Sequence, residues 1–552
     1  MPQSDQQHPT AAVIGNLDVV IVGAGFSGLY LLHRLREQRL SAIAFEAGSG
    51  VGGTWYWNRY PGARCDVESM QYSYSFDETL QQEWKWSERF SAQPEILDYA
   101  NHVADRFELR REIKLKTRVT KAHFDETTER WAIETDKGDR VSARYCVMAT
   151  GCLSAARRPD FKGIDSFEGP TYHTGEWPHE PVSFADQRVG IIGTGSSAIQ
   201  AIPVIAEQAG HVTVFQRTPN YSIPSRNGPM TEEYERSWKD DYPALRANAR
   251  ASTNGIVAER NDFSAMSVSP EERLAILEDR WASGGTTFMA AFNDLATNQA
   301  SNDATADFVR DKIRSIVNDH DTAELLAAKD YPIGTKRICV DTQYFETFNR
   351  ENVKLVDVRD APIDEITPKG LRIGDQHYEF DALVFATGFD AMTGTLLKID
   401  IQGRNQTTLA EKWEAGPRTY LGLMVERLPN MFMVTGPGSP SVLSNMMVSI
   451  EQHVDWIVDA LDYLNTNGLD VIEPTEEAEG AWVGHVNEVA HKTLYPKAAS
   501  WYMGANIPGK PQLFMPYIGG VGAYRAKCDD VVQRGYEGFV LSASEATSDA
   551  AD

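Results

Sequence analysis

Two short apolar runs each predict a buried β-strand that leads into a glycine-rich turn. The first run, residues 17–22 (LDVVIV), precedes a G-x-G-x-x-G turn that starts at Gly23, and residues 29–40 then have helical spacing. The second run, residues 188–192, enters a similar turn at Gly193. Strand, tight turn and helix in this order are typical of a dinucleotide-binding unit. Two such units predict an α/β fold with two Rossmann-like dinucleotide-binding domains.

The alternation of strands and helices stops between residues 227 and 329, where long polar segments with helical spacing predict a helical insertion. Residues 270–281 and 305–317 show this spacing most clearly. Four apolar residues of the second segment share one helix face: Val309, Ile313, Ile316 and Val317. After the insertion we expect no clear strand before residues 353–358, and another at residues 382–386.

The first glycine turn has the residue types that suit bound FAD. Gly23 permits the tight turn, Gly25 lets the backbone approach a pyrophosphate, and Gly28 lets the helix pack close to the strand. The following strand ends at Glu46, where an acid accepts hydrogen bonds from ribose hydroxyls. A glycine pair in residues 52–57 (GGTWYW) suits backbone that lies against a flavin.

The second glycine turn predicts NADP. Gly193 and Gly195 are followed by Ala198 as the third small residue, and the next strand, residues 211–215, leads to Arg217 rather than to an acid. An acid would bind a free 2′-OH and repel a 2′-phosphate, whereas an arginine offers several donors to the phosphate. On its own, Arg217 is also compatible with a solvated cation at a strand end.

Two similar strand ends predict that both domains are discontinuous. Apolar strands run into Ala-Thr-Gly at residues 149–151 and at residues 386–388, where we expect the chain to pass between the nucleotide domains. The expected division is an FAD-binding domain of residues 16–151 and 386–541, an NADP-binding domain of residues 152–226 and 330–385, the insertion at 227–329, and loose tails at 1–15 and 542–552.

Composition and net charge limit the cellular compartment and the classes of binding partner that we expect. A chain of 552 residues suits two or three domains, and 42% hydrophobic residues suffice for a sizeable core. The net charge of -25 disfavours nucleic acid and anionic membranes, because its field repels both. No apolar stretch approaches the roughly 18 residues of a membrane span, and the polar N-terminus lacks a signal-peptide core. Five scattered cysteines without a C-x-x-C pair indicate neither disulfides nor a metal site, so we expect a cytoplasmic protein with no evident protein partner.

A longer motif carries a family resemblance. The pattern F-x-G-x-x-x-H-x-x-x-W-P is matched by Phe167, Gly169, His173, Trp177 and Pro178. With it, nearly the whole chain resembles the type I Baeyer-Villiger monooxygenases, which are class B flavoproteins, and in particular the phenylacetone and steroid monooxygenase branch. Further similarity lies in residues 52–66, 334–337, 436–440 and 501.

This resemblance implies an enzyme that uses FAD, NADPH and O2 to convert aromatic, cyclic or steroid-like ketones to esters or lactones through a C4a-peroxyflavin anion. Sulfoxidation is implied as a side activity. The anion needs a fixed cation in a dry site, and an arginine stays protonated there. By resemblance that cation is Arg337, Lys336 contacts the NADP 2′-phosphate, and Asp66 lies near the flavin and modulates Arg337. Without the family, the basic pair suits a solvated turn equally well, and an Asp after such a turn is usually a cap.

The resemblance also implies the remaining site residues. Predicted FAD contacts are Gly23, Gly25, Ser27, Gly28, Glu46, Thr54, Trp55, Tyr56, Trp57, Asp66, Tyr72, Val119 and Met446. Predicted NADP contacts are Gly193, Thr194, Gly195, Ser196, Ser197, Arg217, Thr218, Lys336, Arg337 and Trp501. The predicted substrate pocket contains Val67, Cys152, Leu153, Ser441, Val442, Leu443 and Met446. His173 and Trp177, in a linker between the domains, are expected to hold or transmit a domain arrangement rather than to act as a base.

Other functions fit part of the pattern. An N- or S-oxygenating flavin monooxygenase would use a similar scaffold, but the full F-x-G-x-x-x-H-x-x-x-W-P motif and Arg337 favour ketone oxygenation. A disulfide reductase would need a redox-active cysteine pair, and neither C-x-x-C nor C-x-x-x-x-C occurs. A nucleotide sensor without catalysis has no evident need for Arg337 beside Lys336.

Overall fold

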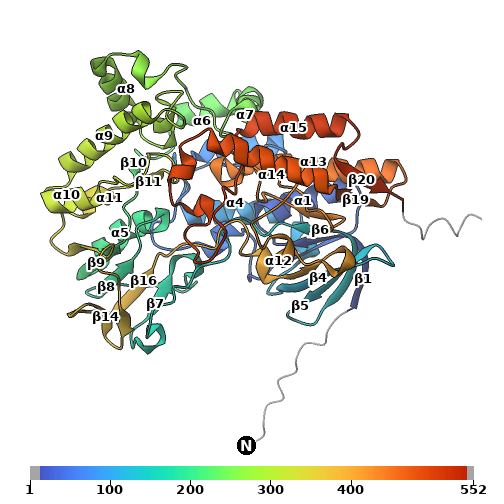
Figure 1. Ribbon diagram of the computed structural model, residues 1–552, viewed down its shortest axis with the longest axis horizontal. Helices are drawn as coiled ribbons and strands as arrows, with labels where there is room; N and C mark the ends of the chain where they lie inside the picture. Colours follow the sequence, from blue (N-terminus) through green and yellow to red (C-terminus); the bar gives the residue numbers. More distant parts are fainter. Residues whose placement is uncertain (1–12, 544–552) are drawn as a thin grey trace, which may run out of the picture.

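A computed structural model describes residues 13–543 and shows two main sheets side by side, with helices packed around and above them (Figure 1). The larger sheet has the strand order β17-β4-β5-β6-β1-β2-β3, and β18 pairs with β6. Its strands are β1 (Val13–Val22), β2 (Ala42–Phe45), β3 (Ile113–Lys114), β4 (Val119–Asp125), β5 (Arg130–Thr135), β6 (Arg140–Met148), β17 (Asp400–Gln402) and β18 (Met431–Met433). The α/β fold class is therefore confirmed.

The first predicted strand-turn-helix unit lies at the centre of the larger sheet. β1 pairs in parallel with β2 and β6, and it is apolar on both faces because both are covered: Val19, Val20 and Ile21 are all fully buried. Helix α1 (Phe26–Glu37) follows the glycine turn and packs against α13 (Met446–Thr466).

The second unit forms a five-stranded sheet of order β12-β9-β8-β16-β7, in which all pairs are parallel. Its strands are β7 (Thr171–His173), β8 (Arg188–Ile192), β9 (His211–Gln216), β12 (Val353–Asp357) and β16 (Ala382–Phe385). Helix α5 (Ser196–Gln208) follows the turn after β8. Strands far apart in sequence thus share each sheet, which supports the proposed discontinuous domains.

The region between residues 227 and 329 is mainly helical, as predicted. Its helices are α6 (Glu232–Lys239), α7 (Tyr242–Ala251), α8 (Pro270–Ser283), α9 (Gln299–Ile316) and α10 (His320–Leu326). Helix α9 begins six residues before the expected start, because the Asn298 side chain caps it by accepting a hydrogen bond from the Ala300 N–H. Val309, Ile313 and Val317 are buried and Ile316 is half-buried against the same cluster, which confirms the predicted apolar face.

Of the other helices, α11 (Tyr344–Thr347) packs against α5 and α9. The rest lie around the larger sheet and its cover: α2 (Thr54–Trp57), α3 (Glu78–Glu83), α4 (Gln93–Arg106), α12 (Leu409–Lys412), α14 (Glu476–His491) and α15 (Val521–Gln533). Figure 1 shows α13, α14 and α15 together above the larger sheet. Among residues 13–543, no helix is both long and apolar enough to cross a bilayer.

Several expectations about strands and tails were wrong. A strand does precede residue 353: β11 (Cys339–Asp341) pairs in parallel with β10 (Ser222–Pro224), and Ser222 Oγ donates to Asp341 Oδ2 at 2.5 Å. The small antiparallel sheet of β13 (Glu365–Thr367), β14 (Gly370–Ile373) and β15 (Gln376–Glu379) was also missed. Strands of three or four residues are too short to show a periodic signal.

Parts of both expected tails belong to sheets. Residues 13–15 begin β1, and Ser542 ends β20 (Phe539–Ser542), which pairs with β19 (Val471–Pro474). The rest of the two predicted tails, residues 1–12 and 543–552, lies outside the described residues except for residue 543.

Candidate active site

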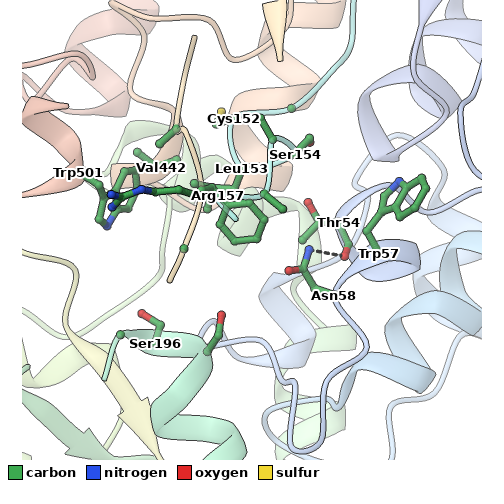
Figure 2. Close-up of a pocket in the computed structure, with 18 of the residues that line it drawn as sticks. Thr54, Trp57, Asn58, Cys152, Leu153, Ser154, Arg157, Ser196, Val442 and Trp501 are labelled. Carbon is green, nitrogen blue, oxygen red and sulfur yellow. Dashed lines mark hydrogen bonds between the residues drawn. The ribbon is translucent and has the colours of Figure 1, made fainter. Parts of the chain in front are cut away.

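One cavity of about 1120 Å³ lies between the two sheets and is lined by both glycine turns. It is larger than the ~300–1,000 Å³ that suits one small ligand, so it has room for more than one. Figure 2 shows residues from distant parts of the chain around it, including Thr54 and Trp57 on one side, Ser196 below, and Val442 and Trp501 opposite.

The first glycine turn is shaped by close backbone contacts. Gly23 has a φ of +111°, and a Cβ there would lie 2.5 Å from the Ala149 carbonyl oxygen. A Cβ on Gly28 would lie 2.1 Å from the Gly23 carbonyl oxygen, so only glycine lets α1 pack this close to the turn. Because α1 begins just after Gly25, which has no side chain to cap it, its free N–H groups suit an anion at this cavity wall.

Glu46 lines the cavity and is also a structural part of the turn. Its Oε2 accepts a hydrogen bond from the Ala24 N–H at 2.9 Å, and its Oε1 accepts one from the Gly48 N–H at 2.7 Å. A carboxylate has about four lone-pair positions, so these two bonds leave capacity for ligand hydroxyls. Glu46 therefore positions the glycine turn and still fits the predicted ribose contact.

The second glycine turn is open to the same cavity. Gly193 has a φ of +111°, and a Cβ there would meet the Ala386 carbonyl oxygen at 2.4 Å. A Cβ on Gly195 would meet nothing within 4 Å, so the backbone at the start of α5 is accessible to a ligand. Arg217 and Lys336 line the adjoining wall. Burial, and then the nearby Arg217 charge, lower the pKa of Lys336 to about 8.

Arg337 lies in the cavity as a fixed cation. Its Nε donates to Asp66 Oδ2 at 2.8 Å and its Nη2 donates to Asp66 Oδ1 at 2.7 Å, which is the two-pronged geometry of a strong ion pair. Its Nη1 donates to the Val442 carbonyl oxygen at 2.7 Å. The Asp66 charge holds the pKa of Arg337 well above its ordinary value despite burial. Two distant chain segments, at Asp66 and Val442, thus hold one guanidinium in place.

Apolar side chains form the wall beside Arg337. Of the buried residues in this cluster, Cys152, Ala391 and Val442 line the cavity, whereas Met392, Tyr502, Phe514 and Met515 pack in the same cluster without lining it. Cys152 Sγ lies 2.9 Å from Ser441 Oγ, and burial raises the pKa of the Cys152 thiol, which keeps it neutral. This wall limits water near Arg337 and suits an apolar ligand.

Similarity to known proteins identifies the family of this chain. Residues 20–254 match the family described as pyridine nucleotide-disulphide oxidoreductase. A Baeyer-Villiger monooxygenase of Pseudooceanicola batsensis is 44% identical over 97% of this chain and 98% of its own length. This chain belongs to the Baeyer-Villiger monooxygenase family.

Two further known proteins are similar to this chain over nearly their whole length. The solved structure titled oxidized steroid monooxygenase bound to NADP is 52% identical, has a TM-score of 0.92, and matches 96% of this chain and 100% of its own. A phenazine N-monooxygenase of Lysobacter antibioticus is 42% identical over 95% of this chain and 97% of its own length. Membership of the Baeyer-Villiger monooxygenase family is thus compatible with more than one oxygenation reaction.

Most of the site residues that the resemblance implies line the cavity. Four do not: Gly28, Tyr56, Ser441 and Leu443. Gly28 acts through helix packing, and the Tyr56 hydroxyl lies 2.6 Å from Ser49 Oγ instead. Ser441 supports the wall through Cys152, and Leu443 packs against the apolar cluster. In Figure 2 the Asn58 side-chain amide donates to the Thr54 carbonyl oxygen at 2.9 Å beside this cavity.

The family motif lies outside the cavity wall: Phe167, Gly169, His173, Trp177 and Pro178 do not line it. His173 Nδ1 accepts a hydrogen bond from the Gly175 N–H at 3.0 Å, so Nε2 carries the proton and donates to the Arg157 carbonyl oxygen at 3.1 Å. Burial lowers the pKa of His173. The buried Trp177 stacks on Tyr172 at 5.1 Å between ring centroids. These contacts support the predicted role of His173 and Trp177 in holding the segment that links the two domains.

Several cavity residues carry no recognisable sequence signal. Arg157 and Asn506 line the wall from segments without periodic structure, and Asn506 Nδ2 donates to the Phe389 carbonyl oxygen at 2.8 Å. Gln200 of α5 also lines it and accepts a hydrogen bond from the Tyr60 hydroxyl at 2.8 Å, which links the two glycine-turn units. Their positions depend on how distant segments meet, which no local motif records.

Proposed function

We propose that this protein is an NADPH- and O2-dependent flavin monooxygenase that converts ketones to esters or lactones, with sulfoxidation as a side activity. The observation that carries the proposal is the Arg337 guanidinium, held by Asp66 and by the Val442 carbonyl oxygen in a cavity that both glycine turns share. A binding protein without catalysis has no need for a fixed, half-buried cation between two dinucleotide sites.

The residues present fit both cofactors. The Gly25 turn and Glu46 suit the FAD pyrophosphate and ribose, and the open backbone at Gly195 with Arg217 and Lys336 suits NADP. Lining residues proposed to hold FAD are Gly23, Gly25, Ser27, Glu46, Thr54, Trp55, Trp57, Asp66, Tyr72, Val119 and Met446; those proposed for NADP are Gly193, Thr194, Gly195, Ser196, Ser197, Arg217, Thr218, Lys336, Arg337 and Trp501. When bound, the two cofactors supply hydride transfer and the activation of O2.

Arg337 has the properties required to stabilise negative charge during ketone oxidation. Its pKa is held well above the ordinary value, so it stays protonated and does not give its proton to an anion. Asp66 and Val442 fix its orientation before the substrate arrives, so little reorganisation is needed when negative charge develops on the ketone oxygen. We therefore propose Arg337 as the catalytic cation and Asp66 as the residue that positions it.

The apolar wall is proposed to bind the ketone. Val67, Cys152, Leu153, Val442 and Met446 line the cavity, and they suit an aromatic, cyclic or steroid-like carbonyl compound. Exclusion of water from this wall strengthens the interaction of Arg337 with developing charge. We also propose that the reaction takes place in the cytoplasm, where buried thiols such as Cys152 stay reduced.

Product identification tests this function directly. The purified holoenzyme is incubated with NADPH and air together with phenylacetone, cyclohexanone and a steroid ketone in separate reactions, and the products are analysed by mass spectrometry. We expect an ester or lactone one oxygen atom heavier than its ketone. Consumption of NADPH that yields only hydrogen peroxide with every ketone, a phenazine and a thioether would contradict the proposal.

N-oxygenation is the second candidate, and the similarity to a phenazine N-monooxygenase favours it. The same incubation with a phenazine and with a thioether separates the two functions. An N-oxide formed much faster than any ester would make N-oxygenation the main activity. Because Arg337 is a fixed cation suited to anionic chemistry, we expect ester formation to dominate.

We predict that the KM for NADPH depends on pH because of Lys336. Its pKa of about 8 lies below the ordinary value, so its positive charge is present at lower pH and is lost as pH rises through that value. We expect the KM for NADPH, relative to that for NADH, to rise about tenfold between about pH 7 and about pH 9. Steady-state kinetics with both cofactors measure this ratio. The Lys336→Arg variant, which stays protonated, should flatten the dependence; an equally steep profile in that variant would contradict the role of Lys336.

A further inference from the structure

Three cations line the cavity without a carboxylate partner in the described part of the chain. Arg157, Arg217 and Lys336 all line the cavity, and none of them forms an ion pair within 4 Å among the described residues. The two carboxylates that act on these cations at longer range already form ion pairs with other residues. Asp390 Oδ1 accepts from Lys510 Nζ at 2.6 Å, and Asp330 Oδ2 lies 3.2 Å from Arg359 Nη1.

The charge of Arg217 acts on both of the other cations. Arg217 is a cause of the lowered pKa of Lys336, after burial, and likewise of the lowered pKa of Arg157. Arg217 is therefore the common neighbour of the other two. Asp160 and Glu176 also line the cavity, but neither forms an ion pair with any of the three in the described part of the chain. Arg157 and Lys336 are half-buried, whereas Arg217 is exposed. Two half-buried cations on which the charge of a third acts are unfavourable unless an anion binds among them.

Arg157 projects from a backbone that is held at three points. Its N–H donates to the Gly388 carbonyl oxygen at 2.9 Å. Its own carbonyl oxygen accepts from Thr387 Oγ1 at 2.6 Å and from His173 Nε2 at 3.1 Å. The family motif and the Ala-Thr-Gly turn at residues 386–388 therefore both fix the base of this side chain. Figure 2 shows Arg157 among the labelled residues of the cavity, on the same segment as Cys152 and Leu153.

We propose that Arg157 is a third cationic ligand of the NADP 2′-phosphate, together with Arg217 and Lys336. The inference rests on the proposed function, which assigns NADP to this cavity. A phosphate dianion has three acceptor oxygens and matches the fork of N–H donors of a guanidinium. The pyrophosphate instead has the start of α5 at Gly195 as its site, whereas Arg217 follows the end of β9, where the ribose and its 2′-phosphate are expected.

The chain offers a matched control one residue away. Arg158 carries the same charge, but its side chain is 68% exposed and its Nη2 pairs with Asp165 Oδ1 at 2.7 Å. An Arg158→Gln variant therefore changes the net charge as Arg157→Gln does, without removing a cation from the described cavity lining. Any long-range effect of net charge on an anionic ligand appears equally in both variants.

The test is the affinity of the FAD-loaded protein for NADP+ and for NAD+, measured by isothermal titration calorimetry. We expect Arg157→Gln to weaken NADP+ binding about fivefold to tenfold and NAD+ binding less than about twofold, since only NADP+ carries the 2′-phosphate. Arg158→Gln should leave both affinities unchanged. Arg157→Lys, which keeps the charge, should restore part of the NADP+ affinity, whereas a purely structural role of Arg157 would not produce this selectivity.

Two results would overturn the inference. Equal weakening of NADP+ and NAD+ would place Arg157 away from the 2′-phosphate, and an unchanged affinity for both would remove it from the cofactor site. If Arg217→Ala weakens NADP+ binding while Arg157→Gln does not, the proposed function stands and only this inference fails. If the unaltered protein binds no NADP+, both fail together.

Discussion

Replacement of Arg337 by alanine is expected to abolish ester formation, with turnover falling by about 10²–10³-fold or more. The variant loses the cation that stabilises negative charge on the reacting oxygen, and it leaves Asp66 in the cavity without its partner. Ketone-dependent product formation, followed by gas chromatography, measures this loss. Reduction of the flavin by NADPH without oxygen, followed by stopped-flow absorbance, should persist within about tenfold, since hydride transfer does not require the same stabilised charge.

Two further variants define the role of Arg337. Arg158→Ala removes an exposed arginine with its own acidic partner, Asp165, and should leave turnover unchanged. Arg337→Lys keeps a charge but loses the two-pronged pairing with Asp66, so an intermediate rate is expected. Ester formation by Arg337→Ala at more than about one tenth of the normal rate would rule out the proposed catalytic role.

Replacement of Arg217 by alanine is expected to raise the KM for NADPH about 10- to 100-fold, because a hydrogen bond to a charged group contributes about 1.5–3 kcal/mol. The KM for the ketone should change less than about twofold, since the charge of Arg217 acts on Lys336 and Arg217 does not belong to the apolar cluster. Steady-state kinetics with NADPH, NADH and ketone as varied substrates measure all three values.

The comparison with NADH shows whether Arg217 binds the 2′-phosphate. NADH lacks this group, so its KM should stay within about twofold in Arg217→Ala. Arg158→Ala is again the matched control for loss of one positive charge. A similar rise in KM for NADPH, NADH and ketone would instead indicate general damage to the cavity and would contradict the assignment.

The sequence was sufficient to predict the two units built around glycine turns. Apolar strands such as β1 and β8, followed by glycines with a required backbone geometry, give strong local signals. The strand ends at Glu46 and Arg217 were also predicted to face the ligand, and both line the cavity. These features depend on residues close in sequence, so local spacing is enough to find them.

The rest depends on contacts between distant segments. β10 and β11 are three residues each and exist through pairing across more than a hundred residues, so neither has a periodic signal of its own. The contact of Cys152 with Ser441 and the place of Arg157 in the cavity wall arise in the same way. Arg337 was identified from the family resemblance. Its hydrogen bond to the Val442 carbonyl oxygen was not predicted, because every residue has a backbone carbonyl and the sequence does not show which one accepts.

The most direct test of ketone oxygenation at this site is the origin of the inserted oxygen atom. The holoenzyme, NADPH and a ketone that it converts are incubated with isotopically heavy O2 in ordinary water, and the product is analysed by mass spectrometry. We predict that one heavy oxygen atom enters each ester or lactone molecule and that the Arg337→Ala variant forms no labelled ester. An ester without the heavy isotope, or labelled hydrogen peroxide as the only oxygenated product, would contradict the assigned reaction.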